Sequence, residues 1–371
     1  MKITCEREKL SGAFQTAAAV APARSPKTIL QNVKLEVSGE EATFSATDLE
    51  IGIRVTTSGI EASRDGAAVL PTARFGSILR ELSDEKIEIE TDERGVFVRG
   101  AHSVFNLPAE NPDTFPSVAE FAEEKFHEIP ARLLKEVIRR TAFATDAEST
   151  RFALGGVMLE LSEKQLVAVG TDGRRLAKME APAQSIGGHV AADGACIIPT
   201  KAMQLIDRSF SDADAEIALA ARSNDMMVKS PRVTIYSRLV EGRFPKWRDV
   251  IPDRTNAHEI DLPVGPFAAA VRQAAIVTSE ESKGIDFAFA GGNLVLSGQT
   301  AEVGESRVEM PIAYDAEPIT ITLNPKFVLD FLKVLDADKT VAAFVTDSAS
   351  AVVCSTEDGY DYVIMPLARD S

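Results

Sequence analysis

The sequence contains no long hydrophobic run. Nowhere in its 371 residues do apolar side chains continue for the roughly 20 positions that a membrane-spanning helix requires. The mean hydropathy is −0.02 and 45% of the residues are hydrophobic, values typical of a soluble globular protein. Because residues 1–8 are charged and strand-like, we expect no signal peptide. The composition therefore predicts a cytoplasmic protein with no membrane partner.

Cysteine and histidine are scarce. The three cysteines, Cys5, Cys196 and Cys354, are odd in number, far apart and surrounded by strand-type residues. We expect buried thiols in a reducing cytosol, and neither disulfides nor metal ligands. Of the four histidines, His127 and His258 each precede a glutamate, but no second histidine follows four residues later, as a zinc-protease motif requires. The sequence therefore predicts no metal and no cofactor.

Motifs for nucleotide binding and catalysis are also missing. The chain has neither the glycine-rich loop that precedes Lys in nucleoside triphosphatases nor the glycine pattern of dinucleotide-binding folds. Among 56 Asp and Glu residues, adjacent carboxylates such as Asp84 and Glu85 are expected by chance on solvated faces. No nucleophile, base and oxyanion donor can be assembled from the spacing. The sequence therefore offers no motif that supports a catalytic role.

What the chain does contain is a threefold repeat. An apolar strand end, a proline, a basic residue and a helical apolar pair recur, with the prolines at Pro71, Pro199 and Pro325. Their spacing is too long for a solenoid unit, which spans roughly 20–50 residues, but it suits a whole domain. Polar, proline-bearing stretches at 111–125 and 249–257 are typical of linkers. We therefore predict three homologous domains, at residues 1–122, 126–252 and 253–371.

Each predicted domain combines helices with hairpins. Apolar residues at helical spacing open the domains near residues 10–21, 134–141 and 267–274, and a second helix after the proline is clearest at 75–82 and 328–335. Between these helices, paired runs of β-type residues flank a turn, which predicts antiparallel hairpins at residues 35–48, 158–172 and 287–297. The predicted fold class is α+β, with two helices per domain covering one face of antiparallel sheets.

Charge is distributed unevenly along the chain. The net charge of −16 argues against simple nucleic-acid binding. The helical segments are nevertheless basic, since residues 131–142 contain four Lys or Arg residues against one Glu. Three similar domains can close head-to-tail with a second chain into a six-domain ring, and a basic lining with an acidic exterior would accept phosphates only inside. The alternative is that surface helices often carry Lys and Arg.

Several motifs in the same order along the chain resemble those of one family. Together with the order of elements, they resemble the bacterial sliding clamp, the beta subunit of DNA polymerase III, over the whole chain. The motifs are residues 1–10, 47–50, 171–176, 239–245, 346–348 and 363–367.

The resemblance implies a DNA polymerase processivity factor. Proteins of this family form a homodimeric ring around double-stranded DNA, tether the replicative polymerase and have no catalytic activity of their own. The resemblance also implies partners that bind through short linear peptides in a cleft between the second and third domains. These partners would be the alpha subunit of the replicative polymerase, the clamp loader, translesion polymerases, ligase and mismatch-repair proteins.

The resemblance further implies three groups of site residues. The peptide-binding cleft is expected to comprise Leu154, Thr171, Gly173, Arg174, Arg175, Leu176, Pro245, Val250, Val363, Met365, Pro366 and Leu367. The residues expected to face DNA are Arg24, Arg74, Arg80, Arg151, Phe152 and Lys201. The dimer interface is expected to involve Leu107, Ile276 and Val277. Arg174 stands where the family often has His and Asp249 where some members have a basic residue, which leaves partner preference open.

Two other classes of function stay open at this point. A peptide-binding scaffold that never encircles DNA would keep the cleft but would not need basic helices. A hydrolase would need a pocket of perturbed carboxylates, which no sequence pattern reveals. The basic helices speak against the scaffold, and the missing catalytic motifs speak against the hydrolase.

Overall fold

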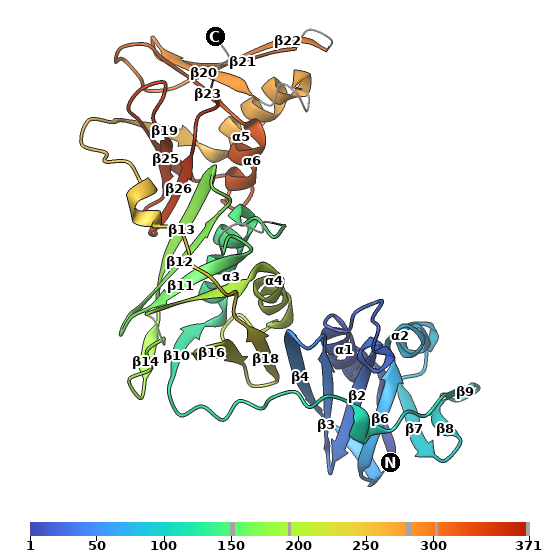
Figure 1. Cartoon of the computed structure of the whole chain (residues 1–371). Coiled ribbons are helices and arrows are strands. Elements are labelled where there is room, and N and C mark those ends of the chain that lie inside the picture. The colour runs from blue at the N-terminus through green and yellow to red at the C-terminus, as the bar shows by residue number, and fades with distance from the viewer. Residues whose placement is uncertain (149–152, 192–193, 279–283, 301–302, 369–371) are drawn as a thin grey trace. The chain divides into compact units, whose positions relative to one another are not determined.

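The structure is a computed structural model that describes residues 1–148, 153–191, 194–278, 284–300 and 303–368. Its contacts divide the chain into two units, each built from several segments. In both units, α-helices lie against antiparallel β-sheets (Figure 1). The predicted α+β class is therefore confirmed. The first unit contains residues 1–133, 162–164 and 183–239, and the second contains residues 134–161, 165–182 and 240–371.

Two sheets form the framework of the first unit. One has the strand order β5-β1-β7-β8-β9, and the other has the order β14-β10-β16-β17-β18-β4-β3-β2-β6. In the second sheet, β4 pairs with β18 from Ile51 opposite Ser237 to Val55 opposite Val233, which joins the first repeat to the second. The strands are β1 (Lys2–Glu6), β2 (Asn32–Ser38), β3 (Glu41–Thr47), β4 (Ile51–Ser58), β5 (Ile60–Arg64), β6 (Gly66–Pro71), β7 (Lys86–Asp92), β8 (Gly95–Arg99), β9 (Val104–Leu107), β10 (Phe126–Pro130), β14 (Gln184–Ile186), β15 (Ala195–Pro199), β16 (Glu216–Ala221), β17 (Asp225–Lys229) and β18 (Val233–Arg238).

The helices of the first unit are α1 (Arg7–Ala18), α2 (Thr72–Glu81) and α4 (Thr200–Ser209). Helix α1 packs on β3 and β4 and against α2. Its Phe14 meets Phe44 of β3 and Phe75 of α2 edge-on, with ring centroids 5.9 and 4.8 Å apart, and all three side chains are buried. Helix α1 ends before the predicted end at Ala21, because Pro22 follows and disfavours helical backbone in the residue before it.

The second unit repeats the same plan. Within this unit, neighbouring strands follow the orders β11-β12-β13-β26-β25-β24-β19 and β22-β21-β20-β23. Helices α5 (Val264–Ala274) and α6 (Pro325–Leu332) pack against each other, and α3 (Ala131–Thr141) contributes its residues from 134 onward. The strands are β11 (Gly156–Leu161), β12 (Gln165–Thr171), β13 (Arg175–Pro182), β19 (His258–Pro263), β20 (Ile285–Ala290), β21 (Asn293–Thr300), β22 (Gly304–Pro311), β23 (Ile319–Leu323), β24 (Thr340–Val345), β25 (Val352–Ser355) and β26 (Tyr360–Ile364).

Local sequence explains where several elements begin. The Asn324 side chain accepts a hydrogen bond from the Lys326 backbone N–H at 3.0 Å, and Pro325 takes the first helical position, so α6 starts at the third proline of the repeat. The three predicted hairpins are confirmed as the pairs β2–β3, β11–β12 and β20–β21. Short 3-10 helices complete the chain at Thr28–Gln31, Pro112–Thr114, Ala142–Ala144, Trp247–Val250 and Ala275–Val277.

The three cysteines lie inside the protein as free thiols. Burial raises the pKa of Cys5, Cys196 and Cys354 from the ordinary value of 9.0 to about 12.

Among the described residues, no helix is long and apolar enough to cross a membrane.

We expect these thiols to react slowly while the protein is folded. A pKa three units higher leaves about a thousandfold less thiolate at pH 8, and the thiolate is the reactive form. Ellman's reagent should therefore label the native protein far more slowly than the protein in denaturant. Rapid labelling of any thiol in the native protein would contradict this expectation.

Candidate functional site

A tight turn between β12 and β13 forms one wall of the candidate site. The Asp172 carboxylate accepts hydrogen bonds from the backbone N–H groups of Arg174 and Arg175 at 2.9 and 3.0 Å. The Thr171 hydroxyl accepts from the Gly173 N–H and donates to the Arg175 carbonyl. Gly173 has φ +85°, a conformation that glycine adopts without steric cost. The sequence from Thr171 to Arg175 is therefore suited to this turn at each position.

The same turn occurs between β3 and β4 in the first unit. Asp48 accepts from the N–H groups of Glu50 and Ile51 at 3.0 and 2.7 Å. Leu49 takes the place of Gly173 and has φ +79°, which is sterically costly for a leucine. Each turn also accepts one backbone hydrogen bond from the end of another strand. The Glu50 carbonyl accepts from the Arg238 N–H, and the Arg174 carbonyl accepts from the Met365 N–H, each at 2.9 Å.

Side-chain size distinguishes the two turns. In the first, Gly52 follows the turn and the side chain of Val118 packs closely over it. In the second turn, Leu176 occupies the position equivalent to Gly52. Trp247 occupies the position equivalent to Val118, because each lies at the same spacing after a Phe-Pro pair, Phe244-Pro245 and Phe115-Pro116. These larger side chains enclose a cavity of about 70 Å³. It is lined by Thr171, Gly173, Arg174, Arg175, Leu176, Pro245, Trp247, Val250, Val363 and Met365.

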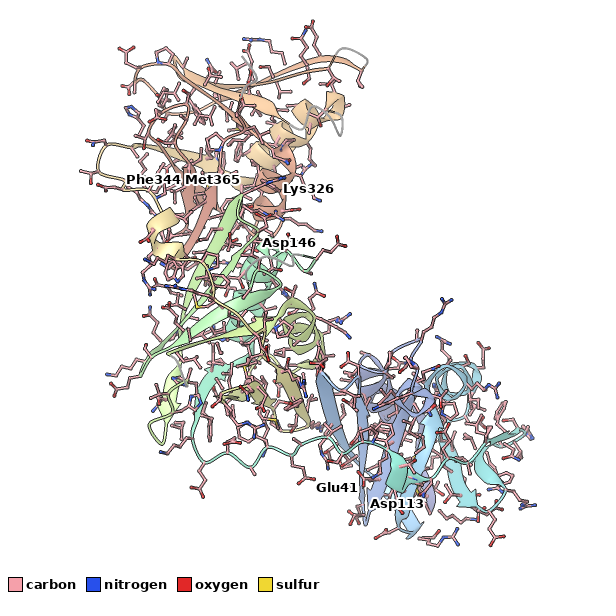
Figure 2. The ribbon with its side chains drawn as sticks, in the orientation of Figure 1. Glu41, Asp113, Asp146, Lys326, Phe344 and Met365 are labelled. Atoms are coloured by element: carbon pink, nitrogen blue, oxygen red, sulfur yellow. The ribbon has the colours of Figure 1, made fainter. Side chains whose placement is uncertain are left out.

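The cavity has an apolar floor and an apolar rim. Leu176 and Val363 are 2% and 1% exposed, whereas Val250 and Met365 are each 42% exposed. Met365 directly follows β26, close to the start of β13 (Figure 2). Exposed apolar side chains beside a small apolar cavity are typical of a surface that binds another molecule.

Trp247 is the cavity residue that the sequence-based prediction missed. Its indole N–H donates to Glu160 at 3.2 Å, and Arg248 holds the same carboxylate through two hydrogen bonds of 2.9 and 2.6 Å. The Arg248 guanidinium also lies 4.1 Å from the ring centre of Trp247. The hydrogen bond from Arg248 holds the pKa of Glu160 below its ordinary value, against the opposing effect of burial. As the only tryptophan of the chain, Trp247 could have been found by comparing the Phe-Pro motifs of the repeats.

Arg175 lines the cavity but is only 8% exposed. Its guanidinium donates to Asp172 at 2.9 Å, to Asp330 of α6 at 2.7 Å and to the Phe143 carbonyl at 2.9 Å. It also lies 5.4 and 4.5 Å from the ring centres of Phe143 and Phe327. Arg175 therefore connects the turn to α6, and its charge is balanced inside the protein.

Three predicted cleft residues lie outside the cavity lining. Leu154 is buried, and its carbonyl accepts a hydrogen bond from the Asp146 N–H. Pro366 and Leu367 follow Met365 and lead away from the cavity lining. The Leu367 N–H donates to the Thr322 carbonyl of β23, and the Leu367 side chain lies against Gly284.

The predicted DNA-facing residues in the described part of the chain lie on α2, on α4 and between α1 and β2. Arg74 and Arg80 are exposed on α2, Arg24 is exposed between α1 and β2, and Lys201 is exposed in the first turn of α4. The Lys201 ammonium group pairs with Asp48 at 2.5 Å. Arg151 and Phe152 lie outside the described residues.

One helix is less uniformly basic at its surface than its sequence suggests. Arg140 of α3 is 8% exposed and pairs with Glu136 and Asp358 at 2.6 and 2.7 Å. Its guanidinium lies 5.1 Å from the ring centre of Tyr360. Arg140 therefore stabilises the interior of the second unit and adds nothing to an exposed basic face.

The predicted interface residues differ in exposure. Ile276 is 75% exposed and Val277 is partly buried, both in the 3-10 helix after α5. Leu107 is only 5% exposed, at the end of β9. Strand β9 is the edge of its sheet in the first unit, and β22 is the edge of a sheet in the second. Both edges carry an exposed valine nearby, Val104 at 64% and Val303 at 56%.

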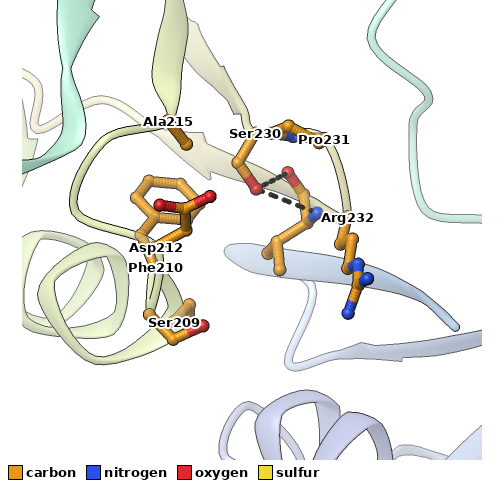
Figure 3. Close-up of a pocket in the computed structure, with 9 residues that line it drawn as sticks. Ser209, Phe210, Asp212, Ala215, Ser230, Pro231 and Arg232 are labelled. Atoms are coloured by element: carbon orange, nitrogen blue, oxygen red, sulfur yellow. Dashed lines mark hydrogen bonds between the residues drawn. The ribbon is translucent and has the colours of Figure 1, made fainter.

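A second cavity of about 400 Å³ lies in the first unit, between the end of α4 and the β17–β18 turn (Figure 3). Its lining is mixed, with Phe210, three serines, Asp212 and Arg232, and it contains none of the predicted site residues. Ser230 is committed to the turn, since its hydroxyl accepts from the Val233 N–H at 3.1 Å. In the described part of the chain, no group of three or more His, Cys, Asp or Glu side chains is placed to hold a metal ion.

Comparison with known proteins decides the family. Domain models of the DNA polymerase III beta subunit match residues 1–119 (N-terminal domain), 128–246 (central domain) and 248–368 (C-terminal domain). The chain belongs to the DNA polymerase III beta subunit family. The boundaries 1–122, 126–252 and 253–371 remain predictions.

Individual relatives agree with this assignment. The beta sliding clamp of Chlamydia pneumoniae is 30% identical over 369 residues, which cover 99% of both chains. The structure of the Pseudomonas aeruginosa sliding clamp bound to griselimycin has a TM-score of 0.92 and 27% identity, with both chains covered completely. The Bacillus subtilis clamp, at 23% identity, shares the fold with a TM-score of 0.91 over 100% and 99% of the two chains.

Membership of this family establishes the function. The chain is a DNA polymerase processivity factor, a non-catalytic subunit that acts as a dimeric ring around DNA. The hydrolase and the scaffold that never encircles DNA are therefore excluded. Among the solved structures, the Caulobacter crescentus clamp, with 27% identity and a TM-score of 0.90, has PEG bound to a putative beta-motif tethering region.

Proposed function

We propose that the cavity beside Met365 is the peptide-binding site through which the chain recruits its partners. The observation that carries this proposal is an enclosed apolar floor, Leu176 and Val363, next to the exposed apolar side chains of Val250 and Met365. Such a surface suits Leu or Phe anchors of a short peptide, and Met adapts its shape to different anchors. Leu154, Pro366 and Leu367 would form the outer part of the cleft.

The proposed partners are proteins of DNA replication and repair. They comprise the alpha subunit of the replicative polymerase, the clamp loader, translesion polymerases, ligase and mismatch-repair proteins. These proteins act on the chromosome, so the proposed location is the cytoplasm. Arg174 at the cavity rim would favour peptides that carry an acidic residue or a free carboxylate next to the anchors.

For the ring itself, we propose that Arg24, Arg74, Arg80, Arg151, Phe152 and Lys201 face the DNA. Exposed Arg and Lys side chains on α2 and α4 support this assignment, since cations contact phosphates without reading sequence. We further propose that Leu107, Ile276 and Val277 lie at the dimer interface. There, β9 of one protomer would pair with β22 of its partner, because both are open sheet edges.

The peptide site can be tested at Met365. Replacing Met365 by Ala should cost roughly 1–2 kcal/mol of binding free energy, about a tenfold loss of affinity, because apolar anchors dominate such pockets. The measurement is calorimetry with a Gln-x-Leu-Phe type peptide, with the dimer checked by sedimentation. Val190→Ala, which removes an equally apolar side chain that is 69% exposed, is the control. Unchanged affinity in Met365→Ala would place the site elsewhere.

A further inference from the structure

Asp330 belongs to α6 and touches none of the cavity. Its carboxylate nevertheless accepts a 2.7 Å hydrogen bond from Arg175, which does line the cavity. The side chain of Arg175 is 8% exposed and that of Asp330 is 31% exposed, so the pair is only partly screened by water. A pair of this kind holds its geometry more firmly than a surface ion pair does.

The contact continues from Arg175 into the turn of the cavity wall. Arg175 donates to one carboxylate oxygen of Asp172, and the other oxygen of Asp172 accepts the N–H groups of Arg174 and Arg175. Asp172 therefore uses one oxygen to shape the turn and the other to anchor it. Asp172 and Asp330 are thus joined through the Arg175 guanidinium.

The turn from Thr171 to Arg175 is also hydrogen-bonded to Met365 at the cavity rim. The Arg174 carbonyl accepts the backbone N–H of Met365, so the position of the turn fixes where the Met365 side chain begins. The turn between β3 and β4 in the first unit has no counterpart of the Arg175 side chain, because Ile51 occupies the equivalent position. The first turn has its own ionic link to a helix, from Lys201 of α4 to Asp48. Of the two turns, the one that borders the cavity is linked to its helix through a buried arginine.

We infer that Asp330 is a positioning residue for the peptide site, acting through Arg175 and Asp172. This inference rests on the proposed peptide-binding function. Without the Asp330 carboxylate, Arg175 would keep its hydrogen bonds to Asp172 and to the Phe143 carbonyl. The buried positive charge of Arg175 would, however, be undercompensated. The guanidinium would then move toward water and draw Asp172 with it, which would loosen the turn and displace Met365.

The test compares three variants of the full-length dimer. Asp330→Asn removes the charge with little change of shape, Asp330→Glu keeps the charge, and Asp338→Asn removes the same charge from an exposed position after α6. Each is titrated with the Gln-x-Leu-Phe type peptide, and the hydrogen exchange of the Arg174 and Arg175 amides is measured without peptide. Thermal melting and sedimentation report whether fold and dimer persist.

We expect Asp330→Asn to bind the peptide about tenfold more weakly, because the neutral amide leaves the charge of Arg175 undercompensated. Its two turn amides should exchange faster while strand amides of β13 stay protected, a local change that general destabilisation would not produce. Asp330→Glu should recover most of the affinity, and Asp338→Asn should match the wild type. Wild-type affinity and unchanged turn exchange in Asp330→Asn would overturn this inference alone. A wild-type protein that binds no peptide would overturn the proposed function and this inference with it.

Discussion

The protein, once loaded on nicked circular DNA by a clamp loader, should stay on the circle at moderate salt and be lost soon after one restriction cut. The net charge of −16 opposes tight contact with DNA, and Lys201, one of the proposed DNA-facing residues, pairs with Asp48. Direct contacts should therefore be weak and sensitive to salt, because few phosphates are neutralised at any moment. Topology, which salt does not screen, would hold the complex on a closed circle.

The comparison needs DNA molecules that differ only in their ends. Retention is measured by gel filtration of labelled protein on the nicked circle, on the same circle after one cut, and on the cut DNA with bulky blocks at both ends. Blocked ends should restore retention, since a ring cannot pass them. Equal retention on circular and unblocked linear DNA would show ordinary surface binding and would contradict encirclement by this chain.

Much of the fold could be predicted because its signals are local and repeated. The prolines at 71, 199 and 325 each mark a strand that runs into a helix, and the confirmed hairpins follow from alternating β-type runs around turn residues. Helix ends were less certain. Helix α1 ends at Ala18 because of Pro22, a local effect that the hydrophobic pattern alone does not register.

The candidate site was only partly predictable, because its geometry depends on contacts between distant segments. The turn at 171–175 and the end of β26 are visible as motifs, but the contact of Trp247 with Glu160 spans 87 residues and that of Arg175 with Asp330 spans 155. Sequence patterns also do not show whether a basic residue faces solvent. Arg139 is exposed on α3, whereas its neighbour Arg140 is buried among carboxylates and Tyr360.

Ile276→Asp should convert the dimer into folded monomers. Ile276 is 75% exposed in the single chain, which is unusual for a large apolar side chain beside an open sheet edge. If it lies in the core of the interface, a buried aspartate there would lack a partner and raise the dimer dissociation constant by at least about a thousandfold, or roughly 4 kcal/mol. Sedimentation at micromolar concentration should then show a mass near 39.9 kDa in place of twice that value.

A second substitution and a control sharpen this test. Val277→Asp added to Ile276→Asp should complete the dissociation, although Val277 also packs against Gly298 within its own chain and its carbonyl accepts from Thr300. Val190→Asp places the same charge on a side chain that is 69% exposed and should leave the dimer intact. Circular dichroism must show that the monomers remain folded. Dimers that persist in the double variant would refute the interface assignment, and folded monomers that cannot be retained on circular DNA would tie closure of the ring to these two residues.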